Sequence, residues 1–97
     1  MEGERIKMIP EIDELEFEIL NCLYFVEPFD KILEEVSYPP NVVADALKTL
    51  IHKKMVSVMS WEEDSGDYKR SFIYDTDNMR AFSYLATKEG LLAHNSR

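Results

Sequence analysis

Apolar residues in the first half of the chain recur three and four positions apart, which places their side chains on one face of a helix. Prolines mark where these runs begin and end. Pro28 and Pro40 suit the first turn of a helix, and the Pro39–Pro40 pair ends the helix before it, because proline has no N–H to donate. The pattern predicts helices over residues 12–26, 28–36 and 40–54.

After Lys54 the apolar period changes from 3.6 to 2, the period of a strand. Val56 and Val58 begin one alternating run, and Tyr68 begins another. The residues between the two runs include Gly66, which can take positive φ in a turn. The sequence therefore predicts a hairpin with strands over 55–62 and 68–75.

The last quarter of the chain fits two interpretations. The spacing of apolar residues over 79–86 is typical of a helix, whereas the alternation of Phe82 and Tyr84 is typical of a strand. Thr87 suits a helix N-cap because its hydroxyl can accept from the first turn. A final helix is predicted over 88–94, and the structure of 79–86 stays open.

The composition is that of one folded domain. The chain has 97 residues, of which 45% are hydrophobic, enough to form one core. We expect a single α+β domain over 1–97, with residues 1–10 flexible. No apolar run approaches roughly 18 residues, and the N-terminus lacks a signal-peptide pattern. With the lone Cys22 as a buried thiol, these features favour a cytoplasmic protein without a membrane span.

The acidic charge is concentrated in the front third. Residues 1–35 hold eleven acidic and three basic side chains, whereas residues 36–97 hold eight of each, for a net charge of -8. A neutral second part can still carry a local basic face, which matters at short range in salt.

Residues 28–59 resemble the winged helix-turn-helix domain. The stretch ILEEVSYPPNVVADALKTLIHKKMVSV looks like the family's short helix, turn, helix and strand. Val43, Leu47 and Leu50 would take the inward positions of its recognition helix. The resemblance implies a three-helix bundle followed by a β-hairpin wing and a short C-terminal element.

A second stretch, LATKEG at 85–90, is similar to the end of the wing in MarR-type regulators, and this implies a returning strand over 80–85. There are departures from the family. Its members usually place glycine where Lys54 stands, so that the helix can end in a left-handed turn. Its long dimerisation helices are also missing.

The resemblance implies a DNA-binding surface on the outer stripe of the 40–54 helix and on the wing. Polar side chains there would read base edges, and basic ones would meet phosphates, as would Lys54. Against this stand Asp45 on the same stripe and an acidic wing tip at 62–67. The candidate DNA-binding residues are Asn41, Lys48, Thr49, His52, Lys53, Lys69 and Arg70.

Phe17, Leu20 and Tyr24 form a second apolar stripe beside the first on the 12–26 helix. One interpretation is a broad buried face. The other is a homodimer interface, since a lone surface helix rarely needs two stripes.

Catalysis is poorly supported. His52 and His94 are the only histidines, and neither has a Cys or carboxylate at metal-ligand spacing. We therefore expect no catalytic residue, metal or cofactor. Two hypotheses remain. The first is a homodimeric winged-helix transcriptional regulator that binds double-stranded DNA. The second is an interaction module that does not bind DNA and takes a basic protein partner.

Overall fold

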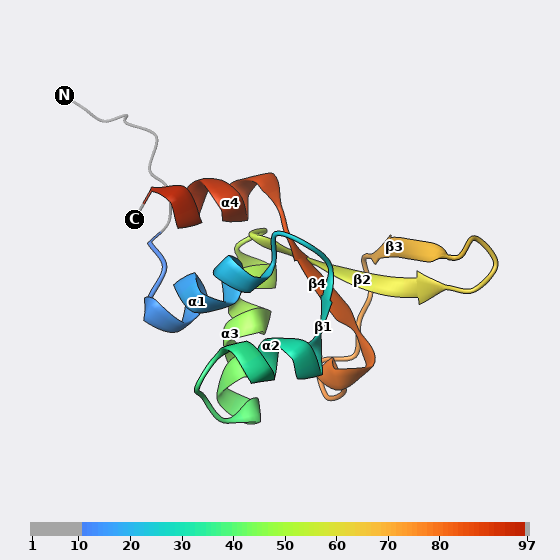
Figure 1. Cartoon of the computed structure of the whole chain (residues 1–97), viewed down its shortest axis with the longest axis horizontal. Helices are drawn as coiled ribbons and strands as arrows, with labels where there is room; N and C mark the ends of the chain where they lie inside the picture. The colour runs from blue at the N-terminus through green and yellow to red at the C-terminus, as the bar shows by residue number, and fades with distance from the viewer. Residues whose placement is uncertain (1–10, 97) are drawn as a thin grey trace.

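Helices and strands alternate along the chain in the computed structural model, which describes residues 11–96. The expected flexible segment 1–10 lies outside this range. The elements are α1 (Glu14–Cys22), β1 (Glu27–Pro28), α2 (Phe29–Glu35), α3 (Pro40–His52), β2 (Val56–Glu62), β3 (Asp67–Ser71), the 3₁₀ turn η2 (Met79–Ala81), β4 (Ser83–Ala86) and α4 (Lys88–Asn95) (Figure 1). The predicted α+β class is confirmed.

The first helix is shorter than predicted at both ends. Asp13 and Glu16 form a capping box, in which each side chain accepts from the other residue's backbone N–H, and this fixes the start of α1. At the other end, the carbonyl of Leu23 accepts from the N–H of Ala86 at 3.0 Å. The helix ends at Cys22 because Leu23 leaves the helical conformation, with ψ at 29°, while its N–H still donates to the Leu20 carbonyl.

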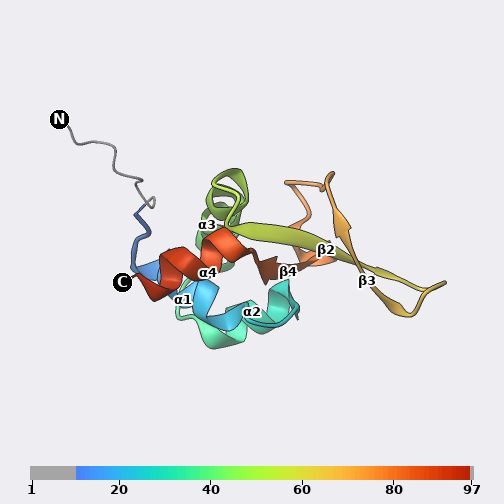
Figure 2. The ribbon, with the colours of Figure 1, turned by 90° about the horizontal axis from the view of Figure 1, so that it is seen from above.

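The four strands form one antiparallel sheet in the order β1-β4-β2-β3. The last strand along the chain, β4, is thus inserted between β1 and β2. Both interpretations of 79–86 are partly right, because the 3₁₀ turn η2 precedes β4. Figure 2 shows the β2–β3 hairpin extending away from the helices, which gather at the other end.

The core lies between the helices and one face of the sheet. Val43, Leu47 and Leu50 on the inner face of α3 are fully buried, as predicted. Val56 and Val58 meet them from β2. Further buried side chains come from α1, α2 and β4 and include Ile19, Leu23, Phe29, Ile32 and Tyr84. The Tyr84 hydroxyl donates to the Met79 carbonyl at 2.8 Å, and burial raises the pKa of Tyr84 above its usual range.

The junction between α3 and β2 is a left-handed turn. Lys54 has a φ of +66°, a left-handed conformation that glycine adopts most easily. The N–H of Met55 donates to the Leu50 carbonyl, and the N–H of Lys54 donates to that of Ile51. This is the Schellman pattern, which satisfies the last carbonyls of a helix.

The start of α4 is hydrogen-bonded to this junction. The N–H of Thr87 donates to the Met55 carbonyl at 2.9 Å, and its hydroxyl donates to the Lys54 carbonyl at 2.7 Å. The same hydroxyl accepts from the N–H of Gly90, so Thr87 is the N-cap that the sequence predicts. A Cβ on Gly90 would lie 2.1 Å from the Met55 carbonyl oxygen, so only glycine permits this approach.

We expect Lys54→Gly to raise the free energy of unfolding by about 1 kcal/mol, because glycine takes positive φ without a steric clash. The matched control is Lys48→Gly within α3, which should lower it by about 1 kcal/mol. Urea unfolding followed by circular dichroism measures both. A loss of stability in both variants would contradict the role given to Lys54.

Gly90→Ala should lower the free energy of unfolding by about 2 kcal/mol or more, because the new methyl group must displace the backbone at Met55. Gly66→Ala separates steric from conformational cost. Gly66 has a φ of +65° and open space around it. Gly66→Ala should therefore lower the free energy of unfolding by only about 1 kcal/mol. Equal losses in the two variants would sink the close-packing explanation.

Candidate interaction surfaces

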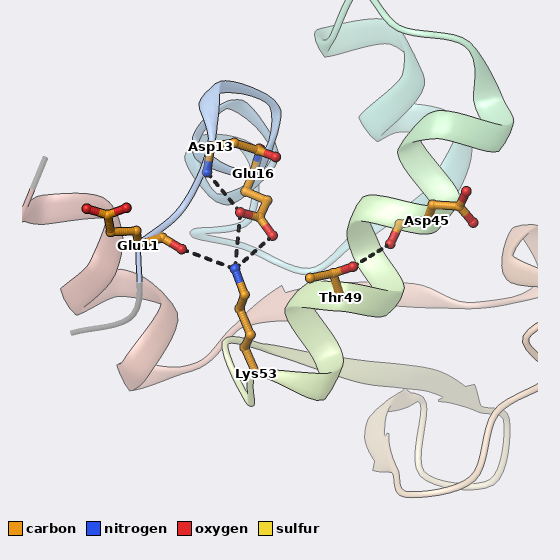
Figure 3. Close-up of polar contacts among 6 residues, drawn as sticks. All are labelled: Glu11, Asp13, Glu16, Asp45, Thr49 and Lys53. Carbon is orange, nitrogen blue, oxygen red and sulfur yellow. Dashed lines mark hydrogen bonds and ion pairs between the residues drawn. The ribbon is translucent and has the colours of Figure 1, made fainter. Parts of the chain in front are cut away.

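The outer face of α3 carries four of the predicted DNA-binding residues. Asn41, Thr49 and His52 are exposed there, and Lys48 is half-buried beside them. The Thr49 hydroxyl donates to the Asp45 carbonyl one turn earlier, at 3.1 Å (Figure 3). The Asp45 side chain is 78% exposed, so a carboxylate stands in the middle of this face.

Lys53 does not belong to that face. Its ammonium lies 3.1 and 3.3 Å from the two carboxylate oxygens of Glu16 and 3.1 Å from the Glu11 carbonyl (Figure 3). The Glu16 side chain is only 6% exposed, and a buried carboxylate needs such a partner. Lys53 is therefore held within the chain, where it joins the end of α3 to α1, and this pairing weighs against its predicted contact with DNA.

Two other predicted phosphate contacts, Lys48 and Lys69, are also paired within the chain. Lys48 lies 3.8 Å from Asp45, and Lys69 lies 3.7 Å from Glu62. Arg80 pairs with Asp30. These exposed pairs add little stability, but each places a carboxylate next to the cation that would meet a phosphate.

Lys54 and Arg70 differ from these bases. Within residues 11–96, neither side chain has an ion pair. The Arg70 guanidinium lies over the Phe72 ring, 4.9 Å from its centroid. Such cation–π stacking holds the guanidinium in place and leaves its edge free to donate.

The predicted dimer stripe is an interface within the chain. Leu20 is fully buried in the core, which corrects its placement on a dimer surface. Phe17 stacks on the His94 ring with centroids 4.4 Å apart, and the Tyr24 hydroxyl lies 3.1 Å from His94 Nδ1. The interpretation as a buried face holds for Leu20 and in part for Phe17, whereas Tyr24 contacts α4 but stays 47% exposed.

Exposed apolar side chains gather on the β2–β3 hairpin and just after it. Trp61 is half-exposed and meets Tyr68 edge to face, whereas Phe72 and Ile73 are 81% and 86% exposed. The predicted strand 68–75 is too long, since β3 ends at Ser71. The Ser71 hydroxyl donates to the Ile73 carbonyl and turns the chain away from the sheet.

A cavity of about 190 Å³ opens where the chain leaves β3. The sequence does not predict this cavity, because the cavity exists only where β3 ends at Ser71. Its lining mixes apolar side chains with the polar groups of Ser57 and Ser71 and with two cations that have no ion pair within residues 11–96, Lys54 and Arg70. The lining residues include Ile51, Lys54, Val56, Val58, Arg70 and Tyr74.

No cluster of metal-ligating side chains occurs among residues 11–96. The Cys22 thiol donates to the Glu18 carbonyl at 3.2 Å. Burial, with the nearby charges of Glu35, Glu27 and Glu18, raises the pKa of Cys22 to about 11, so the thiol stays protonated at neutral pH. No helix of residues 11–96 is long and apolar enough to cross a membrane.

Lys53→Met should lower the free energy of unfolding by about 2 kcal/mol, because it leaves the Glu16 carboxylate buried without its cation. Lys48→Met removes an exposed pair and should change it by less than about 0.5 kcal/mol. Urea unfolding at neutral pH compares them. The double variant Glu16→Gln with Lys53→Met should lose less than the sum of its single changes; strict additivity would contradict the pairing.

Comparison with known protein families, with curated protein sequences and with solved structures finds no match to this chain.

Proposed function

We propose that this chain is a protein–protein interaction domain of winged-helix type that does not read DNA through α3. The winged-helix assignment is supported by the order of α1, β1, α2, α3 and β2, and by the return of β4 between β1 and β2. The β2–β3 hairpin then takes the place of the wing. Fold alone does not decide function, so the proposal depends on the surface.

The observation that carries the proposal is the pairing of the basic residues. Affinity for DNA comes largely from cations that neutralise phosphates. Lys53 forms an ion pair with Glu16, Lys48 lies beside Asp45, and Lys69 lies beside Glu62. A phosphate backbone would have to compete with each of these carboxylates.

The acidic residues on the same surfaces add to this. Asp45 would face the base edges if α3 entered a major groove, and only cytosine offers a donor without a competing acceptor there. The hairpin tip carries Glu62, Glu63, Asp64 and Asp67, all exposed. A wing with this charge would repel the phosphates that it approached.

The hairpin instead carries residues typical of protein interfaces. Aromatic residues and arginine are enriched in binding hot spots. By the register of β2 and β3, Trp61 lies opposite Tyr68 and Met59 lies opposite Arg70. Phe72 follows two positions after Arg70 and is held against its guanidinium. These side chains share the face of the hairpin opposite to the core.

We expect no DNA binding when random-sequence duplex DNA is titrated at about 50 mM salt, where phosphate contacts are strong. Amide shifts of ¹⁵N-labelled protein at roughly millimolar concentration measure this. Asp45→Lys is the control, because it replaces the repelling charge on α3 and should produce weak, salt-dependent shifts there. Shifts of the unaltered protein confined to 41–52 and 69–70, falling steeply with salt, would overturn the proposal in favour of a DNA-binding regulator.

A further inference from the structure

Strand β2 has an unpaired edge beside the cavity. It pairs with β4 from Val56 to Met59, but with β3 only from Val58 onward. Val56 and Ser57 therefore have a neighbouring strand on one side alone. Alternate residues of an antiparallel strand direct their backbone groups to opposite neighbours. Because Met55 accepts from Thr87 on the β4 side, the N–H and C=O of Val56 face the unpaired side.

The notch is this two-residue edge together with the cavity beside it. It exists because the chain turns away after Ser71, where the hydroxyl donates to the Ile73 carbonyl. That turn leaves Phe72 and Ile73 exposed at the rim. Extended peptides add to a sheet at a strand edge that lacks a neighbouring strand, with side-chain pockets beside it giving specificity.

The charge at the notch is positive. Among its lining residues are Lys54 and Arg70 and no carboxylate. Arg70 sits at the end where β3 blocks the edge, since it lies opposite Met59. Lys54 precedes β2 and sits at the open end. Cations at both ends of a cavity with the apolar side chains of Ile51, Val58 and Tyr74 in its lining favour a ligand with a carboxylate beside an apolar side chain.

We propose that the notch binds the C-terminal end of a partner polypeptide. A segment that pairs with β2 at Val56 continues the line of β3 and must stop at Ser71, so the ligand contributes a chain end. Arg70 lies where the bound segment must end, and its positive charge favours a terminal carboxylate over a terminal amine. The segment runs parallel to β2, its last apolar side chain fills the cavity, and Lys54 faces an acidic residue further upstream.

This inference rests on the proposed function and makes its partner more specific. The net charge of -8 favours a basic partner at long range. Fields beyond about 8 Å are screened at physiological salt, so the notch is governed by its own two cations. A partner with a basic body and an acidic, apolar C-terminus satisfies both conditions.

The test is an NMR titration with two probes that differ in one group. They are the acetylated pentapeptide EGSVL with a free C-terminal carboxylate and the same peptide as its C-terminal amide. We expect the free acid at about 5 mM to shift the amides of Val56, Ser57 and 70–73. The amide should bind about tenfold more weakly, the loss of one charge-assisted hydrogen bond.

Two variants of the full chain assign the cations. Arg70→Gln should abolish the preference for the free acid, because it removes the charge at the blocked end. Lys54→Gly should weaken both probes while the fold becomes more stable, so reduced binding cannot come from unfolding. Lys88→Gln, an exposed change on α4, is the matched control and should bind as the unaltered protein does.

Equal binding of acid and amide, shifts confined to the Trp61 face of the hairpin, or no shifts at all would each overturn the notch assignment. None of these results bears on the DNA titration. If the peptides fail and DNA also fails to bind, the interaction domain stands and its docking surface lies elsewhere. If DNA binds on α3, the proposed function itself is wrong.

Discussion

The rest of the structure depends on the left-handed turn between α3 and β2. Lys54 and Met55 must reverse the chain while α3 stays packed through Leu50, and the Schellman bonds do this. The carbonyls of the same two residues then accept from Thr87, so β4 and α4 are positioned by the same turn. Gly90 lets α4 approach this backbone. A shift of the turn would therefore move α3, the sheet and α4, which packs against α1, together.

Much of the fold is predictable from the sequence because burial imposes a period on it. The inward residues Val43, Leu47 and Leu50 are buried, as their spacing predicts. The ends of the helices and strands are harder to predict, since local hydrogen bonds determine them. The Asp13–Glu16 capping box at the start of α1 and the Ser71 hydroxyl at the end of β3 are examples. The strand order could not be predicted from the sequence, because the insertion of β4 between β1 and β2 pairs residues at least 24 positions apart.

The candidate site was less predictable than the fold for a related reason. The basic run at the end of α3 looks free in the sequence, yet Lys53 meets Glu16, 37 positions away. The apolar stripe of Phe17 and Tyr24 looks free in the sequence, yet the His94 ring of α4 stacks on Phe17 and lies within hydrogen-bond distance of the Tyr24 hydroxyl. Whether a charged or apolar side chain is available to a partner depends on such distant contacts. Periodicity reports the face on which a residue lies and not what covers that face.

Lys54 connects the constraint on the fold with the proposed binding site. Glycine would suit its positive φ better, so the fold alone gives no reason for a lysine there. Its side chain has no ion pair within residues 11–96 that would offset the strain. A residue that breaks a local rule without a structural gain is where a function is to be sought. The strained turn places the Lys54 side chain at the open end of the notch, so its charge is oriented by the backbone bonds that hold α3, β2 and α4 together.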